Sequence, residues 1–214
     1  MSTKLLLVRH GETLDNRRRV FQGQSGAGLT GEGRDQAARL AARLAATGAR
    51  WDALYTSDLE RARETADILG RTAGLVPEPD AGLREVSLGG WEGLHESEVK
   101  RRFPDEWEAW RRGEDIPRGG GERLSDVSAR MAATVARIAA RHEGGTVLVV
   151  SHGAAIKSFT AHVLSTTTLR LRPLRPVANT GASLFERSAE GALSLLVYND
   201  TTHLEDALAA ALAS

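Results

Sequence analysis

The chain begins with KLLLVRHGET at residues 4–13, where four apolar residues lead directly into a charged segment that contains glycine. A short continuous apolar run predicts a strand that is covered on both faces, as in a parallel sheet. Arg9, His10 and Gly11 then lie just beyond the carboxyl end of this strand. Because open α/β sheets bind their ligands beyond the carboxyl ends of the strands, we predict a functional site at His10.

The segment at residues 146–153 has the same arrangement. Thr146 to Val150 predicts a second buried strand, and Ser151, His152 and Gly153 follow it at once. Other strands are predicted at residues 51–56, 182–186 and 193–198, and helices from Thr30 to before Gly48, from a Ser57-Asp58 cap to Leu69, from Leu124 to Ile138 and from Ala154 to Leu164. This alternation predicts an α/β fold, a three-layer α/β/α sandwich around a mostly parallel sheet.

Residues 88–121 differ in composition from the rest of the chain. Trp91, Phe103, Trp107 and Trp110 lie among many charged residues, and three consecutive glycines at 119–121 close the stretch. We interpret it as a small helical insertion over the active site. We therefore expect residues 1–214 to form a single domain, and the alanine-rich tail at 204–214 to be a terminal helix or a frayed end.

Composition excludes several kinds of chemistry. The absence of cysteine removes disulfides, thiolate metal sites and a cysteine nucleophile. The 28 basic residues balance the 28 acidic ones, so no net charge attracts nucleic acid or a membrane surface. With no apolar run of membrane length and no signal-like start, we expect a cytoplasmic protein; a homodimer is left open. Among the basic clusters, residues 17–19 and 170–175 are the best candidates for touching a substrate.

Two histidines at equivalent strand ends can meet at one edge of a sheet. The alternative for His10 and for His152 is a strand cap with a hydrogen-bonded imidazole. Arg9 beside one histidine and glycine after both favour an anion site, because glycine lets a backbone N–H approach an anion closely. The spacing of the six histidines contains no helical metal pair, and no role is assigned to the others: His95, His142, His162 and His203.

Several ordered motifs resemble the histidine phosphatase superfamily, which includes phosphoglycerate mutases and many small phosphatases. The first is Arg9-His10-Gly11-Glu12-Thr13 with Asn16. The others are Leu29-Thr30 with Gly33 and Gln36-Ala37, the run from Thr56 to Leu59 with Arg61-Ala62 and Thr65-Ala66, Leu83-Arg84-Glu85, Gly89-x-Trp91-Glu92-Gly93, Gly120-Gly121-Glu122 and Val150-Ser151-His152-Gly153. The resemblance covers roughly residues 3–187.

The resemblance implies a metal-independent phosphatase without a cofactor, acting on a small phosphorylated metabolite through a phosphohistidine intermediate. It implies catalytic roles for His10, Arg9, Arg61, Glu85 and His152, and phosphate or substrate binding by Asn16, Gln22, Gly23, Gly153, Arg9, Arg61 and His152. Arginine forks match phosphate oxygens, and a protonated His152 adds another donor. His10 must be neutral, with one ring nitrogen toward phosphorus and the other donating to a backbone carbonyl.

Three alternatives accompany this interpretation. Glu85, at the position of the general acid, could instead form a surface salt bridge with Arg84. The chain could be a phosphoglycerate mutase-type phosphotransferase, although the stretch from Leu83 to Leu94 resembles the compact phosphatase version. It could also be a non-catalytic module that binds a phosphorylated ligand, whose usual sign, loss of a core site residue, is not found. Thr13 is interpreted as structural.

Overall fold

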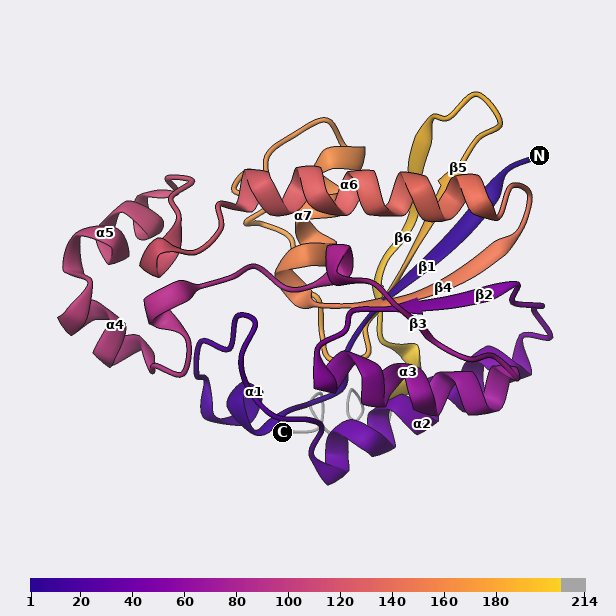
Figure 1. Cartoon of the computed structure of the whole chain (residues 1–214), viewed down its shortest axis with the longest axis horizontal. Coiled ribbons are helices and arrows are strands. Elements are labelled where there is room, and N and C mark those ends of the chain that lie inside the picture. The colour runs from indigo at the N-terminus through magenta and orange to yellow at the C-terminus, as the bar shows by residue number, and fades with distance from the viewer. Residues whose placement is uncertain (205–214) are drawn as a thin grey trace.

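The computed structural model describes residues 1–204, in which strands and helices alternate (Figure 1). The strands are β1 (Thr3–Arg9), β2 (Ala53–Thr56), β3 (Glu78–Pro79), β4 (Thr146–Ser151), β5 (Ala182–Arg187) and β6 (Leu193–Asp200). The α-helices are α1 (Leu14–Arg18), α2 (Gly31–Ala46), α3 (Glu60–Ala73), α4 (Glu96–Arg102), α5 (Pro104–Arg112), α6 (Leu124–Arg141) and α7 (Gly153–Val163). Short 3₁₀ helices are η1 (Ala81–Leu83), η2 (Gly89–Trp91), η3 (Arg118–Gly120) and η4 (Thr202–Leu204).

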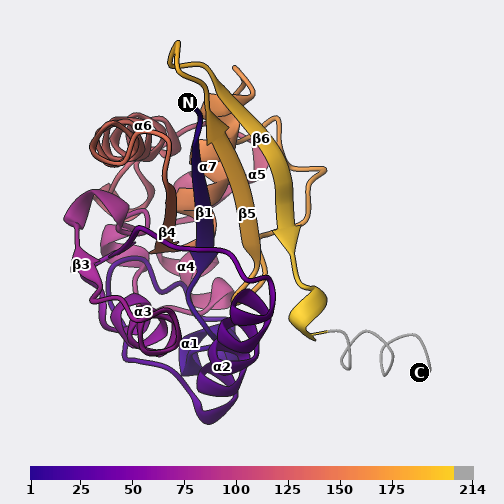
Figure 2. The same cartoon turned by 90° about the vertical axis from the view of Figure 1, so that its right-hand side faces the viewer.

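A six-stranded sheet has the order β3-β2-β4-β1-β5-β6. The strands β3, β2, β4 and β1 are parallel, and β5 and β6 add two antiparallel pairings at the far edge (Figure 2). In the pairing of β1 with β4, Arg9 lies opposite Ser151. The two strands therefore end at the same level, and His10 and His152 leave the sheet side by side.

The strands alternate their side chains between two apolar layers, as the pleat of a sheet requires. Leu5, Leu7, Val147 and Val149 pack against α6 and α7, together with side chains from residues 83–107. The intervening residues of β1, β2 and β4 pack against α2 and α3 on the opposite face, as Figure 1 shows. The predicted α/β/α sandwich with a mostly parallel sheet is confirmed.

The helix beginnings follow the local sequence, with one exception. Thr30 caps α2 as predicted, because its side chain accepts a hydrogen bond from the backbone N–H of Gly33 at 3.0 Å. The predicted Ser57-Asp58 cap of α3 is wrong. The helix begins at Glu60 without a side-chain cap, while Asp58 forms an ion pair with Arg84.

The insertion contains two helices, α4 and α5, beyond the end of the sheet at which β1 and β4 stop (Figure 1). Its aromatic side chains pack around Trp91, which has no exposed surface. Phe21 joins this cluster from the segment after β1, and its backbone N–H donates to the Leu94 carbonyl at 3.0 Å. The insertion is thus held against the loop that follows His10.

Two short elements, α1 and β3, are absent from the sequence prediction. Thr13 caps α1 in a capping box with Asn16, which agrees with a structural role for Thr13. Of the predicted tail, residues 205–214 lie outside the described part of the chain. Within residues 1–204, no helix is both long and apolar enough to cross a membrane.

Candidate active site

His10 and His152 face each other at the carboxyl end of the sheet. The backbone N–H of His10 donates to the Ser151 carbonyl at 3.0 Å, which extends the pairing of β1 with β4 by one residue. The ring centroids are 5.1 Å apart, and the two residues are 2% and 0% exposed. Two imidazoles from opposite parts of the sequence are therefore brought into one buried site.

The ring of His10 is oriented by its own loop. Its Nδ1 lies 2.8 Å from the Gly11 carbonyl oxygen, which can only accept a hydrogen bond, so Nδ1 carries the proton and Nε2 keeps a free lone pair. Burial, followed by the charges of Arg9 and Arg61, lowers the pKa of His10 well below its ordinary value. The Gly11 carbonyl is a backbone partner of the kind expected from the sequence, and the lowered pKa favours the expected neutral ring.

His152 is buried without a hydrogen-bond partner on either ring nitrogen. This contradicts the alternative that it caps its strand with a hydrogen-bonded imidazole. Burial, followed by the charges of Arg61, His10 and Arg9, lowers the pKa of His152 well below its ordinary value. The lowered pKa favours a neutral side chain, whereas a protonated His152 is expected from the sequence as a phosphate donor.

Arg9 and Arg61 bring two guanidinium groups to the histidines. Nη1 of Arg9 donates to the Val177 carbonyl at 2.7 Å, and Arg61 donates to the carbonyls of Ser25 and Gly23 at 2.8 and 2.7 Å. The Nε atoms of both arginines are buried and have no partner. Burial lowers the pKa of Arg61 to about 10 against the opposing charge of Glu85, so the guanidinium remains charged at neutral pH.

The side chain of Glu85 contacts the first turn of α7, far from it in the sequence. Its Oε2 accepts from the backbone N–H of Ala154 at 3.0 Å, and its Oε1 accepts from that of Ala155 at 2.9 Å. The alternative of a salt bridge with Arg84 is wrong, because Arg84 pairs with Asp58 at 2.5 Å. Helix N–H groups hold the Glu85 carboxylate at the end of the sheet that carries both histidines.

The other predicted binding residues surround this centre in different ways. Gly153 begins α7 directly after His152, and the Gly23 carbonyl accepts from Arg61. Gln22 is 8% exposed, and its buried Nε2 has no partner. The Oδ1 atom of Asn16 is already occupied, because it accepts hydrogen bonds from the Thr13 backbone N–H and from a neighbouring asparagine side chain.

That neighbour, Asn179, was missed by the sequence analysis. Its side-chain amide donates to the His10 carbonyl at 3.1 Å and to Asn16 at 3.0 Å. Thr65 supports the same loop, since its hydroxyl accepts from the Gly11 backbone N–H at 3.1 Å. The family motif already included Thr65, whereas Asn179 lies in a loop without a local pattern that marks it.

In each basic cluster proposed to touch substrate, residues 17–19 and 170–175, one arginine has a partner within the protein. Arg17 forms an ion pair with Glu12 at 2.6 Å. Arg172 donates to the carbonyls of Trp110 and Arg111 in the insertion. No group of three or more His, Asp and Glu side chains in residues 1–204 is arranged to hold a metal ion.

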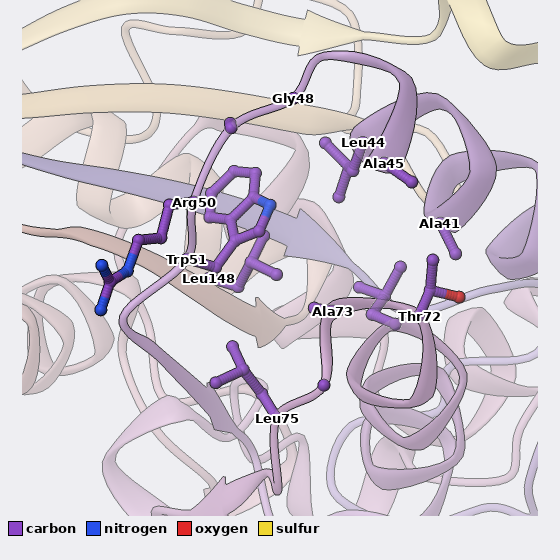
Figure 3. Close-up of a pocket in the computed structure, with 13 residues that line it drawn as sticks. Ala41, Leu44, Ala45, Gly48, Arg50, Trp51, Thr72, Ala73, Leu75 and Leu148 are labelled. Carbon is purple, nitrogen blue, oxygen red and sulfur yellow. The ribbon is translucent and has the colours of Figure 1, made fainter.

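A separate hollow of about 500 Å³ opens between α2 and α3 (Figure 3). Its lining includes Leu44, Trp51 and Leu75, with mostly alanine, glycine and leucine around them. Arg50 is its one ionisable group, and neither histidine of the site borders it. We therefore place the candidate active site at His10 and not in this hollow.

Comparison with known proteins agrees with this geometry. A sequence model described as histidine phosphatase superfamily (branch 1) matches residues 5–201. The chain is similar to the 2,3-bisphosphoglycerate-dependent phosphoglycerate mutase of Brucella anthropi, at 36% identity over 165 residues that make up 74% of this chain and 80% of the mutase.

Two solved phosphatase structures resemble the whole fold. One is a mutant of phosphoserine phosphatase from Entamoeba histolytica in complex with phosphoserine, with a TM-score of 0.83, 29% identity and coverage of 94% of this chain and 99% of that chain. The other is mycobacterial glucosyl-3-phosphoglycerate phosphatase in complex with VO3, with a TM-score of 0.81, 32% identity and coverage of 92% and 98%.

Proposed function

Because the chain belongs to branch 1 of the histidine phosphatase superfamily, we propose that it hydrolyses a small phosphomonoester metabolite through a phosphohistidine on His10. The reaction needs no metal, since arginine and histidine donors supply the charge that a phosphoryl group requires. Candidate substrates are a sugar phosphate, a phosphoglycerate derivative or a nucleoside phosphate such as ribazole phosphate. Similar proteins are named for phosphoserine and glucosyl-3-phosphoglycerate, which supports a small acidic phosphomonoester.

One observation carries the proposal: buried nitrogen atoms without partners gather around His10. They are Nε of Arg9, Nε of Arg61 and both ring nitrogens of His152. Leaving buried polar groups unpaired costs stability, so such a cluster is retained where a ligand satisfies it. Two permanent cations and a histidine in this arrangement suit a dianionic phosphoryl group.

In the first step, Nε2 of His10 attacks phosphorus and the bond from phosphorus to the ester oxygen breaks. Arg9 and Arg61 neutralise the phosphoryl oxygens, while His152 donates one N–H to them and takes up a proton more readily beside the dianion. This step requires the Glu85 carboxyl group in its protonated form: it gives that proton to the departing oxygen, which leaves as an alcohol. The products of this step are the free alcohol and a phosphohistidine.

In the second step, water attacks the phosphohistidine. Glu85, now ionised, accepts a proton from this water as the phosphorus–nitrogen bond breaks. Inorganic phosphate leaves, His10 regains its lone pair and Glu85 is protonated again. The same carboxyl group thus acts first as an acid and then as a base.

The test is phosphate release from p-nitrophenyl phosphate and from a panel of phosphorylated metabolites in excess chelator. Wild type should release phosphate, and His10→Ala should lower kcat by about 1,000-fold or more, as for other covalent nucleophiles. Unchanged hydrolysis by His10→Ala contradicts the histidine mechanism. Loss of wild-type activity in chelator contradicts metal independence.

The similarity to the Brucella mutase favours one second function, phosphoglycerate mutase-type phosphotransfer. In that reaction a bisphosphorylated primer loads His10, and the phosphoryl group returns to the substrate instead of passing to water. Isomerisation of 3-phosphoglycerate that depends on 2,3-bisphosphoglycerate, with negligible phosphate release, would support this function over hydrolysis. A non-catalytic binding module predicts tight phosphate binding and no turnover in either assay.

A further inference from the structure

Arg118 in the insertion is buried and takes no part in the two steps of the proposed reaction. The residue is 7% exposed, and its Nη2 is fully buried without a hydrogen-bond partner. Within residues 1–204, no carboxylate forms an ion pair with it. Other arginines nearby in the sequence do have carboxylate partners: Arg112 pairs with Glu114, and Arg130 pairs with Glu122.

The loop that carries Arg118 is fixed against the loop that carries Glu85. The Glu122 backbone N–H donates to the Ser87 carbonyl at 2.9 Å. A Cβ on Gly119 would lie 2.4 Å from the Leu88 carbonyl oxygen, so only glycine permits this approach of the two backbones. A substituent on the substrate's alcohol, extending past Glu85, would therefore meet this part of the insertion.

Electrostatics agree with this position. Burial lowers the pKa of Arg118, and the charges that oppose the change are those of Glu85 and then Asp115. The charge of Glu85 also opposes the lowering of the pKa of Arg9 and of Arg61. Three buried guanidinium groups thus share Glu85 as a neighbouring charge, but only Arg9 and Arg61 also lower the pKa of His10.

We infer that Arg118 binds a second anionic group, a carboxylate or another phosphate, on the alcohol portion of the substrate. The inference rests on the proposed function, in which Glu85 protonates the alcohol oxygen. A guanidinium fork matches either oxyanion and would satisfy the buried Nη2 when the anion binds. Arg118 would then select acidic phosphomonoesters over neutral ones.

The test compares substrates that differ by one anion. Glycerol 3-phosphate is matched with 3-phosphoglycerate, which has a carboxylate in place of the terminal hydroxymethyl group. 3-Hydroxypropyl phosphate is matched with 1,3-propanediol bisphosphate, which has a second phosphate in place of the hydroxyl. In each pair, kcat/KM for the anionic member divided by that for the neutral member measures selectivity. Wild type should favour at least one anionic member, and the pair in which it does so identifies the anion.

Arg118→Met should lower this selectivity about 10-fold or more, the usual effect of losing a hydrogen bond to a charged group. Arg118→Lys, which keeps the charge, should restore part of it. Arg101→Met is the control, because Arg101 is exposed on α4 of the same insertion and should leave the selectivity unchanged. Equal loss on both members of a pair, or unchanged selectivity, would overturn the inference.

A binding measurement separates this inference from the proposed function. Calorimetry with 3-phosphoglycerate and 1,3-propanediol bisphosphate compares His10→Ala with His10→Ala/Arg118→Met, so no turnover is needed. The double variant should bind the preferred anionic compound about 10-fold more weakly. If the single and double variants bind each compound with the same affinity, the role of Arg118 is overturned. If wild type releases phosphate from none of the esters, the proposed function alone is contradicted.

Discussion

His10 combines a ring that favours the neutral form with a fixed tautomer, and it needs both to act as a nucleophile. Burial and the flanking arginines lower its pKa, while the Gly11 carbonyl holds the proton on Nδ1. The nucleophile is thus prepared before substrate binds, and the cationic side chains that suppress its protonation are those proposed to bind the phosphoryl oxygens. One pair of arginines serves both purposes.

Replacement of Arg61 should lower both activity and stability more than replacement of any other arginine. The side chain is 1% exposed and donates hydrogen bonds to two backbone carbonyls as well as lying in the site. We expect Arg61→Met to lower kcat about 100-fold or more, as when one donor of an oxyanion site is removed. It should also lower the denaturant midpoint, because the Ser25 and Gly23 carbonyls lose their partner. Steady-state kinetics and denaturant unfolding test both effects; retention of wild-type kcat would contradict the role of Arg61.

We expect His203 to make the stability of the fold depend on pH. Its ring accepts or donates a hydrogen bond at Thr180, and burial, opposed by Asp200, lowers its pKa to about 4 from 6.5. Between these pH values the unfolded chain binds more protons than the native protein, so this contribution to stability is present above pH 6.5 and is lost as pH falls toward 4.

The fall in Tm from pH 7 to pH 5 should therefore be smaller in His203→Gln than in wild type. Thermal unfolding followed by circular dichroism measures both, and a scan at pH 8 gives the baseline for each protein. An equal fall in both proteins would show that His203 does not titrate in this way.

At the scale of elements, the first turn of α2 holds the loop that follows β1. A Cβ on Gly33, in the first turn of α2, would lie 2.2 Å from the Glu12 carbonyl oxygen. A Cβ on Gly11 would lie 2.3 Å from the Gly33 carbonyl oxygen. The two backbones touch directly, so α2 determines where the loop beside His10 lies.

Gly33→Ala should displace that loop, lowering kcat and destabilising the fold by about 1–3 kcal/mol, the usual cost of overpacking. Gly31→Ala is the matched control in the same turn, since a Cβ there meets nothing within 4 Å. We expect Gly31→Ala to keep wild-type kcat and to be neutral or more stable by up to about 1 kcal/mol. Equal effects of both substitutions on kcat and midpoint would contradict the contact.

The elements also explain what the sequence could and could not predict. The strands that precede His10 and His152 are continuous apolar runs, and the carboxyl ends of parallel strands lie at one edge of a sheet, so a shared edge for the two histidines was predictable. The start of α3 was not, because Asp58 is a good cap by type but pairs with Arg84, 26 residues away. Asn179 and Arg118 depend on contacts between distant loops, which no local pattern encodes.

At the scale of the whole molecule, the site exists only when distant segments assemble. His10, Arg61, Glu85, His152 and Asn179 come from five separate segments of the chain. Aromatic packing of Phe21 with Trp91 and Trp107 connects the insertion to the loop after β1. We therefore expect the sheet, its helices and the insertion to unfold together, as one domain.

Trp51→Phe tests this expectation, because it leaves Trp91, Trp107 and Trp110, all in or beside the insertion, as the fluorescent tryptophans. Denaturant unfolding followed by tryptophan fluorescence should then coincide with unfolding followed by far-ultraviolet circular dichroism. A fluorescence midpoint at a lower denaturant concentration than the circular dichroism midpoint would show that the insertion unfolds separately.

The most direct measurement of the central claim is trapping of the phosphoenzyme. Wild type is mixed with a substrate that carries ³²P, quenched in alkali within milliseconds, and digested for peptide mapping. We predict an alkali-stable, acid-labile label on the peptide that contains His10, and no label in His10→Ala. Turnover by wild type without a label, or a label on any other residue, would contradict phosphoryl transfer to His10.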